Sequence, residues 1–262
     1  AGKGCALCIS GPAGIGKTRF LEELKADAKL CGMQVMYGAC FEDHTAPFQP
    51  IIECIRSVEK QLGGLNAWVR DEDLKELAKL FPELGAKPET SHKIPFQSIN
   101  QEDMFCALLQ LLKDLGHRTS LMLCIDDIQW VDQGTQEFIA FLCERLDLLP
   151  IYLFLAQRPQ NDIESKWPVH TEKLALDPLG PKGSKELLIS MFGTADIPQK
   201  FCNDICELSG GNPFAVLEIA KALFSNKTIV WRQNKWVYTT DTDKLPAEIS
   251  KAIALRLECL SE

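Results

Sequence analysis

The segment from Gly11 to Thr18 constrains this chain more than any other, because it matches the pattern Gly-x4-Gly-Lys-Ser/Thr at every position. An apolar run from Cys5 to Ser10 precedes it, and Lys17 to Leu30 follows with the apolar spacing of an amphipathic helix. Strand, glycine-rich loop and helix are the order that a phosphate-binding loop requires. The alternative, an ordinary glycine-rich turn between a strand and a helix, is disfavoured by these flanking elements.

The residue types in this loop suit a nucleotide. Its glycines can adopt backbone conformations closed to other residues, so that successive N–H groups point at a phosphate at the helix N-terminus. We expect Lys17 to place its ammonium on the β- and γ-phosphates and the Thr18 hydroxyl to be a protein ligand of Mg²⁺. The predicted ATP- or ADP-binding residues of the loop are Gly11, Ala13, Gly14, Ile15, Gly16, Lys17 and Thr18.

A second constraint comes from the apolar run that begins at Ser120 and ends in Asp126 and Asp127. Such a run is typical of a buried parallel strand whose carboxyl end faces a ligand. Mg²⁺ bound between Thr18 and the phosphates must also be held from the other side, and we predict Asp126 in that role. Asp127 is then placed to orient or polarise the attacking water. The alternative is a strand-end turn with two solvated acids.

Further strands are expected from Gln34 to Cys40, from Pro150 to Ala156 and, more weakly, from Thr171 to Leu176. Arg158 follows the second of these, and strand tips at one edge of a parallel sheet converge on the ligand. Arg158 is therefore a candidate sensor of the γ-phosphate, and with Asp127 and Lys17 it completes the predicted catalytic residues. A solvent-exposed arginine is its plainer interpretation.

The periodicity also predicts helices, and it changes character along the chain. Residues 85–100 lack periodicity and are expected to form a long exposed loop. After residue 180 helices dominate, with a small hairpin at 228–238, which gives an ATP-binding domain at 1–180 and, at 181–262, a helical domain with the start of a following module. The predicted helices cover 51–62, 66–80, 101–115, 135–146 (capped by Asp132), 184–192, 199–208, 213–224 and 246–260.

Composition sets outer limits on function. The net charge of −8 argues against a nucleic-acid-binding surface over the whole molecule. Neither a signal peptide nor an apolar run long enough for a membrane span is present, and the eleven cysteines lie mostly in apolar runs, so a reducing, cytoplasmic setting is expected. Cys5 and Cys8 lie three apart in a strand and face opposite sides, which disfavours a metal site. The chain begins without Met, and we expect it to be a piece of a longer protein.

Taken together, these motifs resemble the nucleotide-binding module of signal-transduction ATPases with numerous domains. This AAA-like branch of P-loop ATPases is found in maltose-regulator-type activators and soluble class III adenylyl cyclases. The matching segments are residues 11–21, Ile125-Asp-Asp-Ile-Gln-Trp-Val-Asp132, Leu155-Ala-Gln-Arg158, Ser209-Gly-Gly-Asn-Pro-Phe214, residues 245–249 and residues 255–257.

The resemblance implies an α/β fold, in which helices sandwich the parallel sheet of a P-loop NTPase and a smaller, mainly helical lid domain with a short β-hairpin follows. The strand before Arg158 would lie between the loop strand and the strand of Asp126. Pro213 would pack near the adenine, and Trp130 would pack the turn after the acids. The second acid is Asp127 and not the Glu common among fast ATPases, and no arginine finger is evident, so slow turnover is expected.

The sequence therefore favours a regulatory module that binds Mg-ATP, hydrolyses it slowly and gates output or sensor domains of the same longer chain. Self-association is compatible with it, whereas direct nucleic-acid or membrane partners are not expected. An assembly scaffold that holds ADP as a structural cofactor is the main alternative. A DNA-dependent ATPase is disfavoured by the acidic balance and by the Trp130 motif.

Overall fold

The structure is a computed structural model, and it describes residues 3–42, 46–84, 100–159, 171–233 and 235–238. The chain divides into two compact units. The first consists of Ala1–Ser10 and Thr18–Leu174, and the second of Gly11–Lys17 and Ala175–Glu262. The phosphate-binding loop thus belongs to the same compact unit as the C-terminal part of the chain.

The first unit is built on a five-stranded parallel sheet in the order β2-β3-β4-β1-β5. The α/β fold predicted from the sequence is confirmed, as is the position of β4 between β1 and β3. The strands are β1 (Cys5–Ser10), β2 (Gln34–Ala39), β3 (Leu121–Asp126), β4 (Ile151–Gln157) and β5 (Thr171–Ala175).

The parallel register brings the ends of the central strands to one edge of the sheet. Ser10 pairs with Gln157 at the ends of β1 and β4, and Ile125 pairs with Leu155 near the ends of β3 and β4. All six residues of β3 are buried, which explains why its sequence is a continuous apolar run and not an alternating one. Asp126 therefore ends a buried strand, at the edge where the chain leaves β1 for the phosphate-binding loop.

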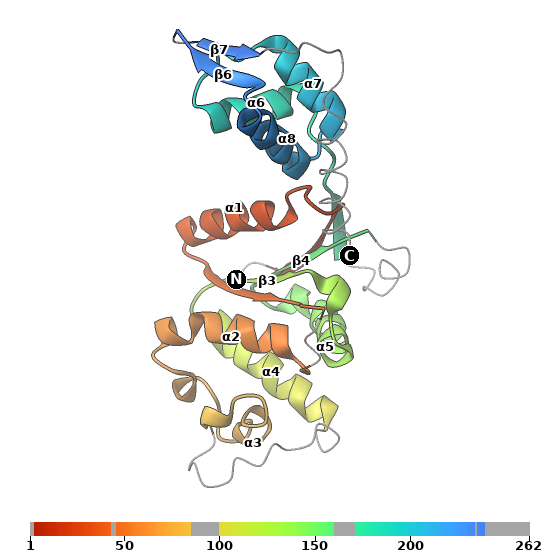
Figure 1. Ribbon diagram of the computed structural model, residues 1–262. Helices are drawn as coiled ribbons and strands as arrows, with labels where there is room; N and C mark the ends of the chain where they lie inside the picture. The colour runs from red at the N-terminus through yellow and green to blue at the C-terminus, as the bar shows by residue number, and fades with distance from the viewer. Residues whose placement is uncertain (1–2, 43–45, 85–99, 160–170, 234, 239–262) are drawn as a thin grey trace. The chain divides into compact units, whose positions relative to one another are not determined.

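Helices cover both faces of this sheet (Figure 1). The helix α1 (Lys17–Leu30) lies on one face, and α2 (Gln49–Leu62), α4 (Gln101–Gly116) and α5 (Gln133–Cys143) lie on the other. Apolar side chains of α2, α4 and α5 form the main core, where the ring of Phe105 contacts Phe138 at a centroid distance of 5.5 Å. The sheet and these helices thus share one packed core, and Asp126 lies at the end of its buried strand β3.

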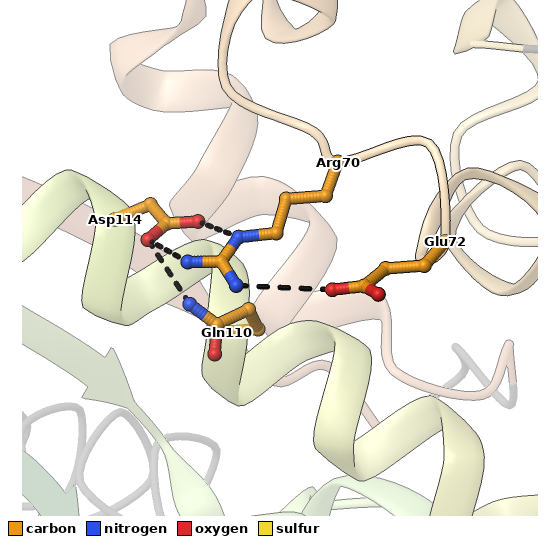
Figure 2. Close-up of polar contacts among 4 residues, drawn as sticks. All are labelled: Arg70, Glu72, Gln110 and Asp114. Carbon is orange, nitrogen blue, oxygen red and sulfur yellow. Dashed lines mark hydrogen bonds and ion pairs between the residues drawn. The ribbon is translucent and has the colours of Figure 1, made fainter.

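The predicted helix at 66–80 is wrong. The structure has a short 3₁₀ helix at Leu65–Ala67, a turn, and a single helical turn, α3 (Leu74–Leu77). Side-chain contacts replace the helical pattern: the Trp68 indole donates to the carbonyl of Leu62 at 3.1 Å, and Arg70 donates to both carboxylate oxygens of Asp114 on α4 at 2.8 Å. Figure 2 shows this Arg70 fork, with Gln110 on the same carboxylate.

The second unit has a core of its own. Three helices, α6 (Pro181–Phe192), α7 (Gln199–Ser209) and α8 (Pro213–Ser225), pack against one another, and the hairpin of β6 (Ile229–Arg232) and β7 (Lys235–Tyr238) follows. The predicted hairpin is confirmed. The expected helix at 246–260 and nearly all of the expected loop at 85–100 lie outside the described residues, and the domain limits at 180 and 181 stay a prediction. No helix in the described ranges is long and apolar enough to cross a bilayer.

Candidate nucleotide-binding site

The loop between β1 and α1 has the backbone that the sequence predicted at two of its glycines. Gly14 has φ +74° and Gly16 has φ +105°, both in the region that L side chains rarely adopt. Gly14 is also crowded, because a Cβ there would lie 2.8 Å from the Cβ of Phe214. Gly11 is confined by packing instead, since its Cβ would meet the side chain of Ile15 at 2.8 Å.

Lys17 is held within the loop. Its side chain is buried, and its ammonium donates to the carbonyl oxygens of Gly11 at 2.8 Å and Pro12 at 3.2 Å. A lysine is costly to bury unless its charge is compensated. Backbone oxygens of the loop thus hold the ammonium that the motif assigns to the β- and γ-phosphates.

Thr18 and Asp126 meet within the first unit. The Thr18 hydroxyl donates to Oδ2 of Asp126 at 2.8 Å, and Oδ1 of the same carboxylate accepts the backbone N–H of Asp127 at 2.9 Å. Asp126 is only 3% exposed. Hydroxyl and carboxylate oxygens are the hard donors that Mg²⁺ prefers, so the residues present fit the metal that the motif implies.

The turn after β3 carries a second set of hydrogen bonds. Asp127 has φ +54°, and its carboxylate accepts the side-chain amide of Gln129 at 2.8 Å. The carbonyl oxygen of that amide accepts the backbone N–H of Arg158 at 3.1 Å. The guanidinium of Arg158 lies 4.9 Å from the ring centroid of Trp130, which itself packs against the main core. Arg158, predicted as a phosphate sensor, therefore stacks on an aromatic ring of its own unit.

Within the second unit, Asn212 binds the loop directly. Its side-chain amide donates to the carbonyl of Ala13 at 2.9 Å, while its side-chain oxygen accepts the backbone N–H groups of Phe214 at 3.0 Å and Ala215 at 3.2 Å. The Phe214 N–H also approaches the carbonyl of Gly14 at 3.2 Å. Asn212 therefore caps α8 and contacts the loop with the same side chain.

Sequence reasoning selected Pro213 from this motif and missed Asn212. Pro213 is the first residue of α8, a position where proline loses no helical hydrogen bond. Asn followed by Pro is itself the signature of a helix N-cap, and this signal was available in the sequence. Gln129 lies in the motif at residues 125–132, and the sequence likewise assigned it no role. Neutral amide side chains such as these are rarely chosen from a motif as catalytic or metal-binding candidates.

Acidic side chains lie at the carboxyl edge of the sheet in the first unit, and their charge raises the pKa of neighbouring groups. The pKa of Tyr37 is raised first by burial and then by the charge of Asp126. The pKa of the Cys40 thiol is raised to about 12, again first by burial and then by Asp132 and Asp127. This edge concentrates negative charge, which is the electrostatic setting that a divalent cation neutralises.

Comparison with known proteins gives the family. The family model of the AAA ATPase domain matches residues 1–155, and the chain belongs to this family. The AAA-like resemblance noted from the sequence is thereby confirmed.

Individual similarities extend beyond that region. The protein R02095 of Rhizobium meliloti (strain 1021) is 23% identical over 244 residues, covering 86% of this chain and 23% of that protein. The STAND protein PH0952 of Pyrococcus horikoshii, which has a tetratricopeptide repeat sensor, shares the fold with a TM-score of 0.50 at 15% identity, covering 97% of this chain and 30% of that one. The Aeropyrum pernix ORC1 protein, solved in complex with DNA, gives 0.49 at 14% identity, covering 97% and 60%. The chain thus spans only part of each of these proteins.

Proposed function

We propose that this chain is a regulatory ATPase module that binds Mg-ATP and hydrolyses it slowly. The observation that carries the proposal is the 2.8 Å hydrogen bond between the Thr18 hydroxyl and the Asp126 carboxylate. Thr18 directly follows Lys17 in the chain, so the phosphate-binding loop and the pair of oxygen donors are neighbours by covalent connection. A metal held by this pair is next to the residues that bind the phosphates.

Each residue has a defined task in this proposal. The N–H groups of Gly11 and of residues 13–17, together with the Lys17 ammonium, bind the phosphates. Thr18 and Asp126 hold Mg²⁺, which neutralises phosphate charge when bound. Asp127 orients the attacking water, and Pro213 contacts the adenine. Asn212 links the loop to α8 through its bond to Ala13, at 2.9 Å, and gives the second unit a means to respond to the nucleotide.

Calorimetric titration with ATP tests the binding step. ATP is expected to bind in the presence of Mg²⁺ and to bind more weakly with EDTA. The Lys17→Ala variant is expected to lose ATP binding. Lys29→Ala, an exposed lysine at the far end of the same helix, is the matched control. Binding that is independent of Mg²⁺, or equal in Lys17→Ala and wild type, would overturn the proposal.

An ADP-holding assembly scaffold is the second candidate. The observation that favours it is the second acid itself, because Asp127 is one methylene shorter than a glutamate. A carboxylate of this short reach is a weaker activator of water. Mass spectrometry of the nucleotide released from purified protein, combined with a single-turnover assay, separates the two candidates. Hydrolysis that Asp127→Asn strongly lowers would exclude the scaffold.

The wider role is also part of the proposal. Nucleotide state would gate output or sensor domains of a longer, cytoplasmic chain, and self-association would be a further means of control. ATP is the ligand, and neither nucleic acid nor membrane is a direct partner. Salt-dependent binding of double-stranded DNA by the chain would contradict this part of the proposal.

A further inference from the structure

We propose that Gln129 is a positioning residue that fixes the orientation of the Asp127 carboxylate and ties it to the end of β4. This inference rests on the proposed function, because it assigns Gln129 a part in the hydrolytic step. Gln129 lies in the 3₁₀ turn Ile128–Trp130, directly after the two aspartates.

The amide of Gln129 is used at both ends. Its nitrogen donates to Oδ1 of Asp127 at 2.8 Å, and its oxygen accepts the backbone N–H of Arg158 at 3.1 Å. The orientation of the amide follows from chemistry: a backbone N–H only donates and a carboxylate only accepts, so the oxygen must face Arg158 and the nitrogen Asp127. No other residue type of this length supplies both an acceptor and a donor without charge.

Asp127 depends on this contact. Its backbone has the left-handed conformation, with φ +54°, and its N–H donates a hydrogen bond to Oδ1 of Asp126 at 2.9 Å. Its side chain is only partly buried, and within the described ranges Gln129 is the one side chain that donates a hydrogen bond to its carboxylate. Without Gln129, no side chain in the part of the chain that the structure describes hydrogen-bonds this carboxylate and limits its rotation about the terminal torsion.

The bonds form a continuous series from Thr18 through Asp126, Asp127 and Gln129 to the backbone of Arg158. The metal-binding pair and the end of β4 are thereby joined through the residue that would orient water. A shift of the β4 end changes the hydrogen bond that holds Asp127. Misplacement of a reacting group by about 1 Å can reduce the rate by about a hundredfold.

Two substitutions separate the contacts of Gln129. Gln129→Glu keeps an acceptor for the Arg158 N–H but faces Asp127 with a second carboxylate, and Gln129→Met removes both bonds at similar volume. Both variants are expected to lower kcat for ATP hydrolysis by about 10- to 100-fold, with the Kd of Mg-ATP unchanged within about twofold. Gln136→Glu on α5 introduces the same charge outside this network and serves as the control.

A double-mutant cycle shows whether Gln129 acts through Asp127. In an Asp127→Asn background, changing Gln129 to Met is expected to have no further effect on kcat. An unchanged kcat in both single variants, or an equal further loss in the Asp127→Asn background, would overturn the inference.

Amide hydrogen exchange tests the hydrogen bond between Gln129 and the Arg158 N–H, at the end of β4, independently of catalysis. The Arg158 N–H is expected to exchange faster in Gln129→Met and at the wild-type rate in Gln129→Glu. If the wild type binds Mg-ATP but never hydrolyses it, the proposed function fails, and exchange still reports on the link. Equal exchange in all three proteins would exclude the link itself.

Discussion

The hydroxyl of Thr18 donates to a carboxylate oxygen of Asp126 at 2.8 Å, across 108 positions of sequence. Thr18 comes from the start of α1 and Asp126 from the end of β3, and the parallel register of the sheet brings these two ends together. A buried carboxylate is costly unless hydrogen bonds satisfy it, and here both of its oxygens accept one.

The first prediction concerns this pair. Asp126→Asn keeps the size of the side chain and an oxygen for the Thr18 hydroxyl but removes the charge that attracts Mg²⁺. The affinity for Mg²⁺ in the presence of ATP is expected to fall on the order of 10- to 100-fold, as when other residues that support a metal site are removed. Calorimetry at several Mg²⁺ concentrations measures it. Asp147→Asn, an exposed acid, is the control, and equal EDTA sensitivity in wild type and Asp126→Asn would contradict the prediction.

Two substitutions of Asn212 separate its two contacts, the cap of α8 and the hydrogen bond to Ala13. Asn212→Ala loses the cap of α8 and the bond to Ala13, and it is expected to reduce the free energy of unfolding by about 1–2 kcal/mol. Asn212→Asp keeps an acceptor at the helix N-terminus and loses only the donor to Ala13. Urea denaturation is expected to find Asn212→Asp more stable than Asn212→Ala, and ATP affinity to fall in both. Equal stability of the two variants would contradict the assigned cap.

The bond between Arg70 and Asp114 predicts a pH effect. The Arg70 hydrogen bonds lower the pKa of the Asp114 carboxyl below its ordinary value. A lowered carboxyl pKa stabilises the fold fully above the unfolded value of about 3.9, and this contribution is lost as pH falls through the lowered pKa.

Because the Arg70 side chain is 47% exposed, solvent screens this pair, and Arg70→Gln is expected to lower the free energy of unfolding only slightly at pH 7. The difference in the free energy of unfolding between variant and wild type is expected to shrink as the pH falls below about 3.9. Denaturation at neutral and at acidic pH measures it, and Asp114→Asn is expected to behave like Arg70→Gln. A larger difference at low pH than at pH 7 would show that the assigned sign is wrong.

The cysteines are expected to react in two groups. Burial raises the pKa of Cys40 and Cys124 to about 12 and that of Cys54 well above its ordinary value. Cys31 and Cys106 are exposed. Thiolate is the reactive form, so iodoacetamide at pH 8 is expected to modify Cys31 and Cys106 in the native protein and the other three only in urea. Peptide mass spectrometry follows each site, and early labelling of Cys54 would contradict its burial.

Local signals in the sequence were sufficient for most of the fold. The apolar run before Asp126 and the hairpin at 228–238 carry their structure in residue types alone, and both are observed. The segment 66–80 could not be predicted in this way. Its helical periodicity is overridden by the Trp68 indole and the Arg70 fork, whose partners lie on other elements.

In the candidate site, too, some features could be predicted from the sequence and others could not. The pairing of Thr18 with Asp126 follows from two motifs and from the geometry of parallel sheets. The position of Arg158 over Trp130 does not, because a stacking partner is set by side-chain directions that spacing does not encode. Asn212 was within reach of sequence reasoning, since its cap is local, but its bond to Ala13 depends on folding.

The positive φ of Asp127 has an evolutionary consequence. Aspartate and asparagine occupy the left-handed region more readily than longer side chains, because a short polar group can bond locally. Replacing Asp127 with Glu, the acid of many rapid ATPases, would extend the reach of the carboxylate but would strain this turn. A longer acid at this position would therefore carry a cost in backbone strain that the short aspartate reduces.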